Sequence, residues 1–318
     1  FPEPIIFGIR AYQYLKNRIH NYDVIHDNQS LSYGVWAIKK MAPTVATIHH
    51  PITVDRQIDV RNASAPWVKL KRMRWYSFIG MQKRVARTLA RIITVSESAR
   101  YDISRAFRIP GSRFSIVPNG INTTQFYPIP EIPRQKIRII VTNSADTPLK
   151  GLFYLLHAIA DVSHTEAIRL VVVGKPKKNS GIEKLIRELD ISRQVTFTGR
   201  IDEKEFVRQY AKAAMAVIPS VYEGFGLPAG EAMACAVPVI SNTGGALPEV
   251  VGDAGILVPP ANSGALADAI RRLLNNPEHA RILGQAGYER VKKIFTWSSA
   301  ARLTIAAYRE AIRDHRRL

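Results

Sequence analysis

Two glutamates, Glu223 and Glu231, bracket a glycine-rich loop in the second half of the chain. An apolar run before this loop and a proline soon after it predict a strand that leads into a helix, because proline suits an early helical position. Backbone N–H groups at a helix N-terminus carry roughly half a positive charge and bind anions. Here these groups belong to Gly224, Phe225, Gly226 and Leu227. The loop therefore suits a sugar nucleotide, whose phosphates would face the N–H groups and whose hydroxyls would face the carboxylates.

A strand–turn–helix with two surface acids is the simplest interpretation of such a pair, but it leaves the Gly-Phe-Gly-Leu-Pro run between them unexplained. The stretch 220–234 resembles the E-x7-E motif of the retaining glycosyltransferases of family 4, which have the GT-B fold. The resemblance extends over nearly all of the chain. It implies that Glu223 is a catalytic residue facing hydroxyls of the donor sugar, and that Glu231 binds the ribose.

Lys150 stands at the start of a predicted helix, 152–161, where the helix dipole disfavours a cation. A solvated surface charge is one interpretation, and a lysine that meets a bound phosphate is the other. The resemblance implies that this lysine neutralises the donor diphosphate during catalysis. The family usually has an arginine a few residues earlier, which the stretch 142–149 lacks. We place Arg200 among the donor-binding residues, although the sequence does not show that it replaces that arginine.

His49 follows the apolar run 44–48 and would lie at the carboxyl edge of a strand. A lone histidine is more often structural, but ligand sites of open α/β sheets lie at this edge. The resemblance implies that His49 lies beside the reacting sugar and the acceptor. Residues Asn119-Gly120-Ile121-Asn122 are similar to the family's Asn-Gly-Val-Asp, a segment that approaches the donor, with Asn122 in place of the acid. Asn119 is equally compatible with a simple turn.

Gly174 and Gly199 each follow a predicted strand and leave room for a flat base to lie against the backbone. The stretch 195–201 resembles the loop of the family that contacts the base. Because such contacts are made mainly by the backbone, they do not distinguish a UDP-sugar from a GDP-sugar. The Gly244-Gly245 pair is compatible with a loop close to the ligand and also with a helix cap.

The elements that must position these residues alternate short apolar runs with longer amphipathic ones, which predicts βα units and parallel sheets. The polar and glycine residues come directly after the apolar runs, so they gather along the carboxyl edge of each sheet. Some of these strands precede a polar, proline-containing stretch at 122–136, and the others follow it. The predicted strands lie near residues 22–26, 44–48, 91–95, 114–117, 137–142, 168–173, 194–198, 215–218 and 237–241.

The proline-containing stretch is the predicted linker between two Rossmann-like domains, an α/β arrangement that the resemblance identifies as GT-B, with parallel sheets facing a central cleft. We place an acceptor-side domain at 1–127, a nucleotide-sugar-binding domain at 128–295, and a last helix at 296–318 that crosses back to the first domain. The first domain of this family opens with a strand and a glycine-rich loop, and no such pattern precedes Tyr22. We therefore expect an incomplete first domain and weak or absent transfer.

The composition fits this organisation and limits the partners. The chain has 318 residues, 46% of them apolar, which suffices for two domains with cores of their own. Its single cysteine, Cys235, cannot form an internal disulfide, so we expect a small buried packing residue, a reducing compartment and a cytoplasmic location. The net charge of +19 predicts anionic partners such as nucleotide phosphates, an anionic membrane or nucleic acid.

Two other functions compete with a glycosyltransferase. A nucleic-acid-binding protein would explain the positive charge, but it would not explain the loop with two glutamates, and no nucleic-acid-binding motif is present. We therefore expect no nucleic-acid partner. A catalytically inactive GT-B scaffold is the second alternative, and the presence of Lys150, Glu223 and Glu231 together argues against it.

The chemistry predicted for the leading function needs no cofactor. The chain has no Asp-x-Asp sequence and no Cys/His cluster with metal-ligand spacing, so no metal site is predicted. Lys150 and helix N-termini would meet the charge on the leaving diphosphate. The resemblance implies a retaining, same-face substitution in which the departing phosphate oxygen helps to deprotonate the acceptor. The predicted activity is transfer of a hexose to an acceptor hydroxyl in cell-envelope, glycolipid or polysaccharide synthesis.

A predicted helix at 66–89 suggests where a membrane would touch the protein. Its cations are interleaved with aromatic residues, a composition that suits the interface of an anionic leaflet. A solvated helix with aromatic core residues is the alternative. A lipid-linked acceptor at the inner face of the membrane would follow from the first interpretation, whereas a free sugar acceptor would be compatible with both. The residues are Trp67, Lys69, Lys71, Arg72, Arg74, Trp75, Tyr76, Phe78, Lys83, Arg84, Arg87 and Arg91.

Overall fold

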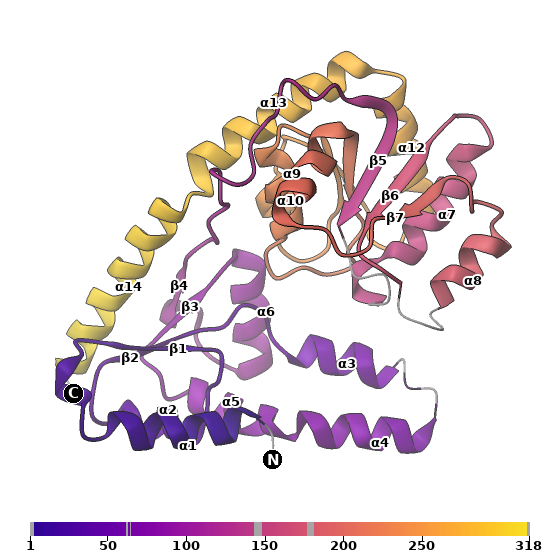
Figure 1. Ribbon diagram of the computed structural model, residues 1–318. Helices are drawn as coiled ribbons and strands as arrows, with labels where there is room; N and C mark the ends of the chain where they lie inside the picture. Colours follow the sequence, from indigo (N-terminus) through magenta and orange to yellow (C-terminus); the bar gives the residue numbers. More distant parts are fainter. Residues whose placement is uncertain (1–2, 62, 64, 143–147, 177–180, 317–318) are drawn as a thin grey trace. The chain divides into compact units, whose positions relative to one another are not determined.

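The computed structural model describes the chain except for residues 1–2, 62, 64, 143–147, 177–180 and 317–318 (Figure 1). The chain divides into two compact units, which we call unit 1 (Phe1–Pro118 with Ala300–Leu318) and unit 2 (Asn119–Ser299). Each unit is built on a parallel sheet with helices packed against it, so the predicted α/β class is confirmed.

Unit 1 contains, within its described residues, a parallel sheet with the strand order β1-β2-β3-β4. All four strands were predicted from their apolar runs. The register aligns Asn28 with Thr47 on the neighbouring strand, so the residues that follow β1 and β2 share one edge of the sheet. The strands are β1 (Ile25–Asn28), β2 (Thr44–Thr47), β3 (Arg91–Thr94) and β4 (Phe114–Ile116).

The helices of unit 1 differ from the prediction in one region. The single helix predicted at 66–89 is wrong: a 3-10 turn, Tyr76–Phe78, separates two helices, because both aromatic side chains turn into the core. A further helix, α3, was not predicted, since 53–61 is polar and lacks a clear apolar stripe. The helices are α1 (Glu3–Leu15), α2 (Tyr33–Ile38), α3 (Thr53–Arg61), α4 (Pro66–Trp75), α5 (Ile79–Ala86) and α6 (Glu97–Phe107).

Unit 2 contains, in its described part, a six-stranded parallel sheet with the order β10-β9-β8-β5-β6-β7. In this unit the chain enters the sheet at the central strand β5 and continues to β6 and β7 on one side. It then returns to the other side of β5, where it forms β8. Ligands of open α/β sheets bind where the strand order reverses in this way. The short edge strand β10 was not predicted. The strands are β5 (Gln135–Thr142), β6 (Arg169–Val173), β7 (Val195–Phe197), β8 (Ala213–Ile218), β9 (Val239–Asn242) and β10 (Ile256–Val258).

Helices cover both faces of the sheet of unit 2 (Figure 1). Alternate side chains of β5, such as Ile139 and Val141, enter a core shared with α7, α8 and α12. On the other face α9 packs on β5 and α10 packs on β8. Cys235, just after α10, is buried as predicted. The helices are α7 (Leu152–Ser163), α8 (Gly181–Glu188), α9 (Glu203–Lys212), α10 (Leu227–Ala234), α11 (Leu247–Val251), α12 (Ser263–Leu274) and α13 (Pro277–Ile294).

The last helix, α14 (Trp297–Arg316), belongs to unit 1 from Ala300 onward. Its alanines pack with Val45 and Ile93 of the sheet, and Arg91 forms ion pairs with Glu310 and Asp314 at 3.4 and 3.1 Å. The units divide at Pro118, whereas the sequence analysis placed the boundary at residue 127. Residues after Pro118 join unit 2 because, for example, the Phe126 ring packs edge-on against Phe206 and Tyr210.

Candidate active site

The loop between β8 and α10 has the structure that its glycines and prolines predicted. The helix α10 begins at Leu227, and Pro228 lies in its first turn. Gly226 caps the helix with a φ of 105°, a conformation that glycine adopts more readily than other residues. The first backbone N–H groups of a helix have no partner within it. Gly226 makes no side-chain cap hydrogen bond, so no capping side chain covers the helix start, where the helix dipole favours an anionic ligand.

Two neighbouring loops hold this loop in place by close backbone packing. The carbonyl oxygen of Glu223 accepts a hydrogen bond from the N–H of Ala246 at 2.8 Å. A Cβ on Gly245 would lie 2.1 Å from that carbonyl oxygen, and a Cβ on Gly151 would lie 1.9 Å from the carbonyl oxygen of Pro219. These glycines therefore serve the packing of the loop itself. Gly245 therefore has a structural role in packing the loop, in addition to the two roles left open by the sequence, a ligand-binding loop or a helix cap.

Lys150 and Glu223, both predicted catalytic residues, are brought together. The Nζ atom of Lys150 lies 2.5 Å from Oε1 of Glu223, and the hydroxyl of Ser220 donates to the same oxygen at 2.8 Å. Lys150 comes shortly after β5, and Glu223 comes after β8, so the pair stands where the strand order of the sheet reverses. A negatively charged ligand can share the ammonium group with this carboxylate.

Glu231 lies one turn into α10 beside a buried tyrosine that the sequence analysis missed. The hydroxyl of Tyr210 lies 3.5 Å from Oε2 of Glu231, 3.5 Å from Oγ1 of Thr142 and 3.4 Å from the carbonyl oxygen of Pro228. Burial raises the pKa of Glu231 to about 7, and the contact with Tyr210 lowers it by less. Burial, followed by the charge of Glu231, raises the pKa of Tyr210 well above its usual value. The carboxyl group of Glu231 therefore changes charge near neutral pH.

Gly174 and Gly199 meet at the carboxyl edge of the same sheet. The N–H of Gly199 donates to the carbonyl oxygen of Gly174 at 3.0 Å, and the N–H of Gly174 donates to Oγ1 of Thr198 at 3.3 Å. The side chain of Lys175 lies against Gly199, with Cε 2.9 Å from where a Cβ would be. Arg200 is exposed directly after Gly199. Lys175 is a cation that the sequence analysis missed, although it follows the glycine that ends a strand.

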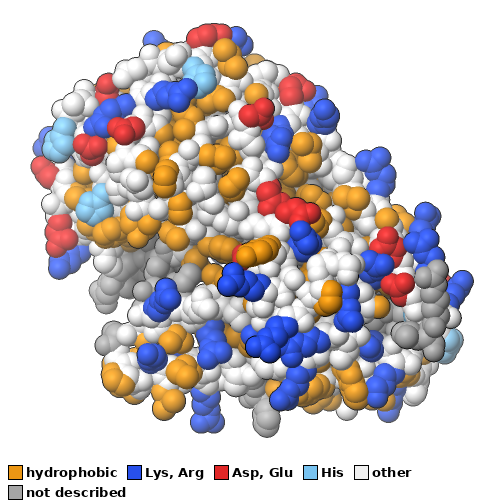
Figure 2. All heavy atoms as spheres, turned by 180° about the vertical axis from the view of Figure 1, so that it is seen from behind, with side chains coloured by type: hydrophobic (Ala, Val, Ile, Leu, Met, Phe, Trp, Pro, Cys, Tyr) orange, Lys and Arg blue, Asp and Glu red, His pale blue; other side chains and the backbone are white. Residues whose placement is uncertain are grey.

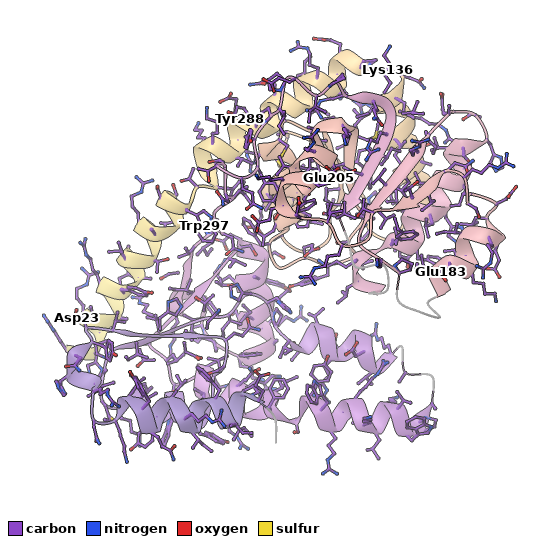
Figure 3. All side chains as sticks on the ribbon, in the orientation of Figure 1. Asp23, Lys136, Glu183, Glu205, Tyr288 and Trp297 are labelled. Carbon is purple, nitrogen blue, oxygen red and sulfur yellow. The ribbon has the colours of Figure 1, made fainter. Side chains whose placement is uncertain are left out.

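The segment that begins with Asn119 and Gly120 packs within unit 2. Gly120 lies against the ring of Trp297, which Figure 3 labels at the start of α14, and a Cβ there would be 2.6 Å from the ring. The N–H of Ile121 donates to the carbonyl oxygen of Phe295 at 2.8 Å. Phe295 also packs edge-on against the ring of Phe225. Because the ring of Phe225 is buried, only its backbone remains for the predicted contact with the donor.

His49 lies in unit 1, at the carboxyl edge of the sheet. Its Nε2 atom is 2.9 Å from Oδ1 of Asn28, and its backbone N–H donates to Oε1 of Gln29 at 2.8 Å. Burial is the largest cause of a lowered pKa of His49, and the neighbouring His50 and His26 lower it further. The imidazole therefore stays neutral to a more acidic pH than an ordinary histidine.

His26, which the sequence analysis did not single out, lies on the neighbouring strand. Its ring bonds to Oγ1 of Thr47 and to the hydroxyl of Tyr308, both at 2.7 Å. Burial lowers the pKa of His26, while Asp27 raises it by less. Tyr308 comes from α14, so no local pattern in the sequence could connect it with His26.

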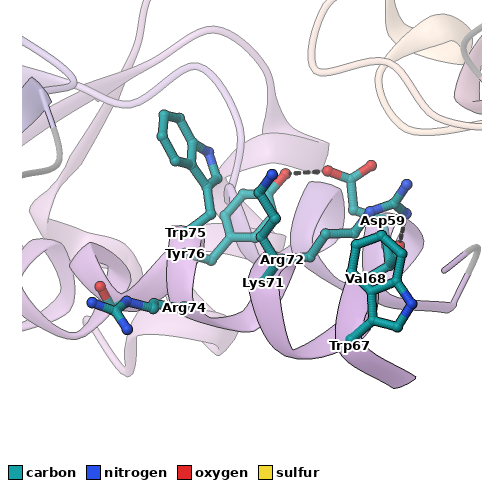
Figure 4. A pocket seen from close by; sticks show the side chains of 9 residues that line it. Asp59, Trp67, Val68, Lys71, Arg72, Arg74, Trp75 and Tyr76 are labelled. Atoms are coloured by element: carbon teal, nitrogen blue, oxygen red, sulfur yellow. Dashed lines mark hydrogen bonds between the residues drawn. The ribbon is translucent and has the colours of Figure 1, made fainter. Parts of the chain in front are cut away.

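The helices α3 and α4 form a groove with a cavity of about 890 Å³ (Figure 4). Trp67 and Trp75 line it with 71% and 66% of their surface exposed. The hydroxyl of Tyr76 donates to Oδ2 of Asp59 at 2.6 Å, and Arg72 donates to the carbonyl oxygen of Asp59. Lysine and arginine side chains gather over unit 1 on the face that Figure 2 shows. Among the described helices, none is long and apolar enough to pass through a bilayer.

The charges available to a diphosphate in unit 2 come from side chains and the helix start. Lys150, Lys175 and Arg200 all follow strands of the same sheet on its carboxyl side. Within the described ranges, no three His, Cys, Asp or Glu side chains are grouped so that they could hold a metal ion. The arrangement can bind a diphosphate through cations and N–H groups, and hydroxyls through Glu223 and Glu231.

Two glycosyltransferase family models together match most of the chain. A family model described as "Glycosyl transferases group 1" matches residues 127–290, and a model described as "Glycosyltransferase Family 4" matches residues 1–125. The expectation that the first domain is incomplete stays a prediction.

Curated relatives agree with the family models. The chain is 44% identical over 316 residues to the MMP α-(1→4)-mannosyltransferase of Mycolicibacterium hassiacum, which covers 98% of this chain and 76% of that protein. It is 31% identical over 319 residues to the D-inositol 3-phosphate glycosyltransferase of Streptomyces bingchenggensis, which covers 93% of this chain and 68% of that protein.

Solved structures show the same fold. Sucrose-phosphate synthase from Thermosynechococcus elongatus superposes with a TM-score of 0.78 at 28% identity, over 96% of this chain and 77% of that one. Anabaena HepE in complex with UDP-glucose has a TM-score of 0.74 at 17% identity, over 94% of this chain and 81% of that one. The second likeness concerns the fold alone. The predicted GT-B fold is thereby confirmed.

Proposed function

We propose that this chain, which belongs to the group 1 glycosyltransferases, moves a hexose from a nucleotide-diphosphate sugar to an acceptor hydroxyl with retention of configuration. The observation that carries this proposal is the contact between Lys150 and Glu223 beside the start of α10. It joins a cation, a carboxylate and the start of a helix at the point where the strand order of the sheet reverses.

The donor would occupy unit 2. In this proposal Lys150 and the N–H groups of residues 224–227 hold the diphosphate, and Glu223 holds hydroxyls of the sugar. Glu231, next to Tyr210, accepts from the ribose hydroxyls. The paired Gly174 and Gly199, with Arg200 after them, form the backbone surface for the base.

The proposed transfer breaks one bond and forms one bond on the same face of the sugar. The bond between C1 and the phosphate oxygen breaks, and the acceptor oxygen bonds to C1. The proton of the acceptor hydroxyl passes to the departing phosphate oxygen, so the products are a glycoside and a nucleoside diphosphate. Lys150 stabilises the charge on that diphosphate, and this scheme requires no metal. His49 would lie beside the reacting sugar and acceptor.

The similarity to a mannosyltransferase supports mannose as the donor sugar and an α-(1→4) linkage as the product. A polysaccharide or glycolipid acceptor at the cell envelope fits the predicted cytoplasmic location. The nucleotide, uridine or guanosine, stays open, because the glycine pair at 174 and 199 offers backbone and no base-specific side chain.

A transfer assay tests this proposal directly. The full chain is titrated calorimetrically with UDP, GDP, UDP-mannose and GDP-mannose, and the donor that binds is then incubated with linear α-mannooligosaccharides. We expect one nucleotide to bind more tightly than the other, and we expect NMR of the product to show an α-glycoside. A β-glycoside, or binding to neither nucleotide, would contradict the proposal.

The exposed face of α4 supports a second proposal, contact with an anionic membrane. Trp67, Leu70 and Trp75 are each about two thirds exposed, and α4 carries cations and no acid. Interfacial helices combine tryptophan with lysine and arginine in this way, at about 1 kcal/mol per cation near an anionic surface.

Flotation with anionic and with neutral vesicles tests the membrane proposal. The protein should float with anionic vesicles at low salt, and the double variant Trp67→Ala/Trp75→Ala should stay at the bottom. Phe153→Ala, which removes another exposed aromatic side chain, serves as the matched control. Absence of flotation of the unmodified chain at low salt would remove this proposal and leave transfer to a soluble acceptor.

A further inference from the structure

We propose that Asn28 and Gln29 are positioning residues that hold His49 with its proton on Nε2 and its free lone pair on Nδ1. This inference rests on the proposed function, in which His49 lies beside the reacting sugar. It concerns residues at the end of β1 that no motif singled out, and it states which atom of the imidazole can accept a hydrogen bond from a substrate hydroxyl.

The contact to the ring determines the tautomer. Oδ1 of Asn28 lies 2.9 Å from Nε2 of His49, and a carbonyl oxygen can only accept a hydrogen bond. From this orientation of the Asn28 amide we infer that Nε2 carries the proton. A neutral imidazole has one donor nitrogen and one acceptor nitrogen, so Nδ1 is left as the acceptor.

The contact to the backbone fixes the position of the residue. Oε1 of Gln29 accepts a hydrogen bond from the N–H of His49 at 2.8 Å, so the last residue of β1 and the residue after it bind the ring and the main chain of the same histidine. Gln29 has a φ of 61°, in the left-handed region that residues other than glycine rarely adopt. A second residue of the turn, Leu31, has a φ of 46°.

The strained turn is held by buried polar groups. The carboxylate of Asp27 accepts from the N–H of Leu31 at 2.8 Å and from the hydroxyl of Ser30 at 2.5 Å. Nε2 of Gln82, a buried residue of α5, donates to the carbonyl oxygens of Gln29 and Ser30 at 3.0 and 3.3 Å. Unusual backbone conformations that the surroundings enforce in this way cluster at functional sites. The turn thus presents two amide side chains to one histidine.

The charges around His49 keep its ring from taking up a second proton, which would bind at Nδ1. The titratable groups that act on it are His50 in its own loop and His26 on β1, and both oppose protonation together with burial. Asp27, also on β1, acts on His26, and Tyr308 of α14 bonds to His26. Near neutral pH the ring is therefore neutral, with Nδ1 ready to accept a hydrogen bond.

Exchange of Asn28 for aspartate separates positioning from simple structural support. A carboxylate next to the ring favours the imidazolium form and raises its pKa by about 1 or more. In Asn28→Asp, the acidic limb of the plot of log kcat against pH should therefore move upward by about one pH unit. Asn262→Asp is the matched control, because Asn262 caps α12 in unit 2 and aspartate caps a helix equally well. An unmoved limb would show that residue 28 does not contact a His49 ring that controls turnover, and that result would overturn the proposal.

Exchange of Gln29 for glycine tests the second contact without disturbing the turn. Glycine adopts a positive φ readily, so Gln29→Gly should fold and lose only the amide that binds the N–H of His49. We expect kcat to fall about tenfold or more, because a misplaced catalytic group reduces turnover. The Kd for the nucleotide, measured in the same variant, should stay unchanged. An unchanged kcat would overturn the role given to Gln29.

A measurement without turnover separates this proposal from the proposed function. In the full chain with 15N-labelled histidine, the ring shifts of His49 report which nitrogen carries the proton. We expect the Nε2–H form in the unmodified chain and a doubly protonated ring at higher pH in Asn28→Asp. A dominant Nδ1–H form would overturn the proposal. If the tautomer is as expected and no donor is used, the positioning is supported and the proposed function fails.

Discussion

The candidate donor site in unit 2 and the histidine cluster in unit 1 are built by different means. In unit 2, glycines let three loops pack backbone against backbone, and an ion pair joins Lys150 to Glu223. In unit 1, His49 is held by side chains that come from a strained turn. Close backbone packing thus shapes a binding site for phosphate in unit 2, whereas amide side chains select the tautomer of one imidazole in unit 1.

The largest expected effect comes from filling the backbone contact in unit 2. Gly151→Ala would place a methyl group 1.9 Å from the carbonyl oxygen of Pro219, at a φ of 70°. We expect unit 2 to lose about 3 kcal/mol or more of its free energy of unfolding, because overpacking and backbone strain add. Urea unfolding followed by circular dichroism measures the loss.

Gly264→Ala is the control for that substitution. Gly264 lies in α12, and the nearest atom to an added Cβ is 3.6 Å away. Alanine there should raise the stability by about 0.5–1 kcal/mol. Equal behaviour of the two variants would show that close backbone packing does not distinguish unit 2.

The next largest effect concerns the cation at the centre of unit 2. Lys150→Met keeps most of the apolar stem and removes the charge that meets the diphosphate. We expect kcat/KM to fall about 100- to 1000-fold, as for removal of a group that stabilises charge in a transition state. Lys184→Met, on the exposed face of α8, is the control and should leave kcat/KM unchanged. A loss of less than threefold for Lys150→Met would separate the ion pair from catalysis.

Glu231 links function to stability through its pKa. A carboxyl group whose pKa is raised to about 7 by burial is charged at pH 8 in the folded state at a cost of about 3 kcal/mol. Between pH 4.5 and 7 the folded state holds the proton of Glu231 more tightly than the unfolded state does. The free energy of unfolding therefore falls as the pH rises through this range.

Glu231→Gln should remove this dependence. We expect the variant to be more stable than the unmodified chain at pH 8 and nearly equal to it at pH 5, as measured by unfolding in urea at both pH values. The nucleotide should bind the unmodified chain more tightly at pH 8 than at pH 6, because ribose hydroxyls donate to the ionised carboxylate. The opposite sign of either trend would contradict the burial of Glu231.

The smallest expected effect lies in unit 1. His26 and His49 have lowered pKa values in the folded state, so below pH 6.5 the unfolded chain binds protons more readily. The contribution of these neutral rings to the free energy of unfolding is fully present above pH 6.5. It is lost as the pH falls through the pKa values of the folded state. His26→Gln should flatten this part of the plot of stability against pH. A stability that rises on acidification would contradict the lowered pKa values of both rings.

The sequence predicted most of what is local and contiguous. Nine of the strands appear near their predicted positions, because an apolar run followed by glycine or a polar residue is a local signal. The loop from Glu223 to Glu231 was predicted with its helix start, since proline and glycine constrain the backbone directly. Lys150 and Glu223 were predicted separately, as residues that meet the diphosphate and the sugar, and their contact appears only in the fold.

The rest depended on residues that meet only in the fold. Tyr210 reaches Glu231 from the preceding helix, and Tyr308 reaches His26 from the end of the chain. The amide of Gln29 serves His49 only because its backbone turns left-handed. The break at Tyr76 was missed because lysines and arginines on both sides of it favour a continuous helix, and only the core attracts the aromatic ring.

We propose that unit 2 holds a nucleotide-diphosphate sugar with Glu231 on the ribose and Glu223 on the sugar, and this placement can be tested in two variants. It is tested most directly by measuring nucleotide Kd and kcat for Glu231→Gln and Glu223→Gln side by side. We predict that Glu231→Gln weakens nucleotide binding about tenfold or more. Glu223→Gln should leave the Kd unchanged and lower kcat, with a loss of about 2–4 kcal/mol of transition-state stabilisation. Small and equal losses in both variants would contradict the account.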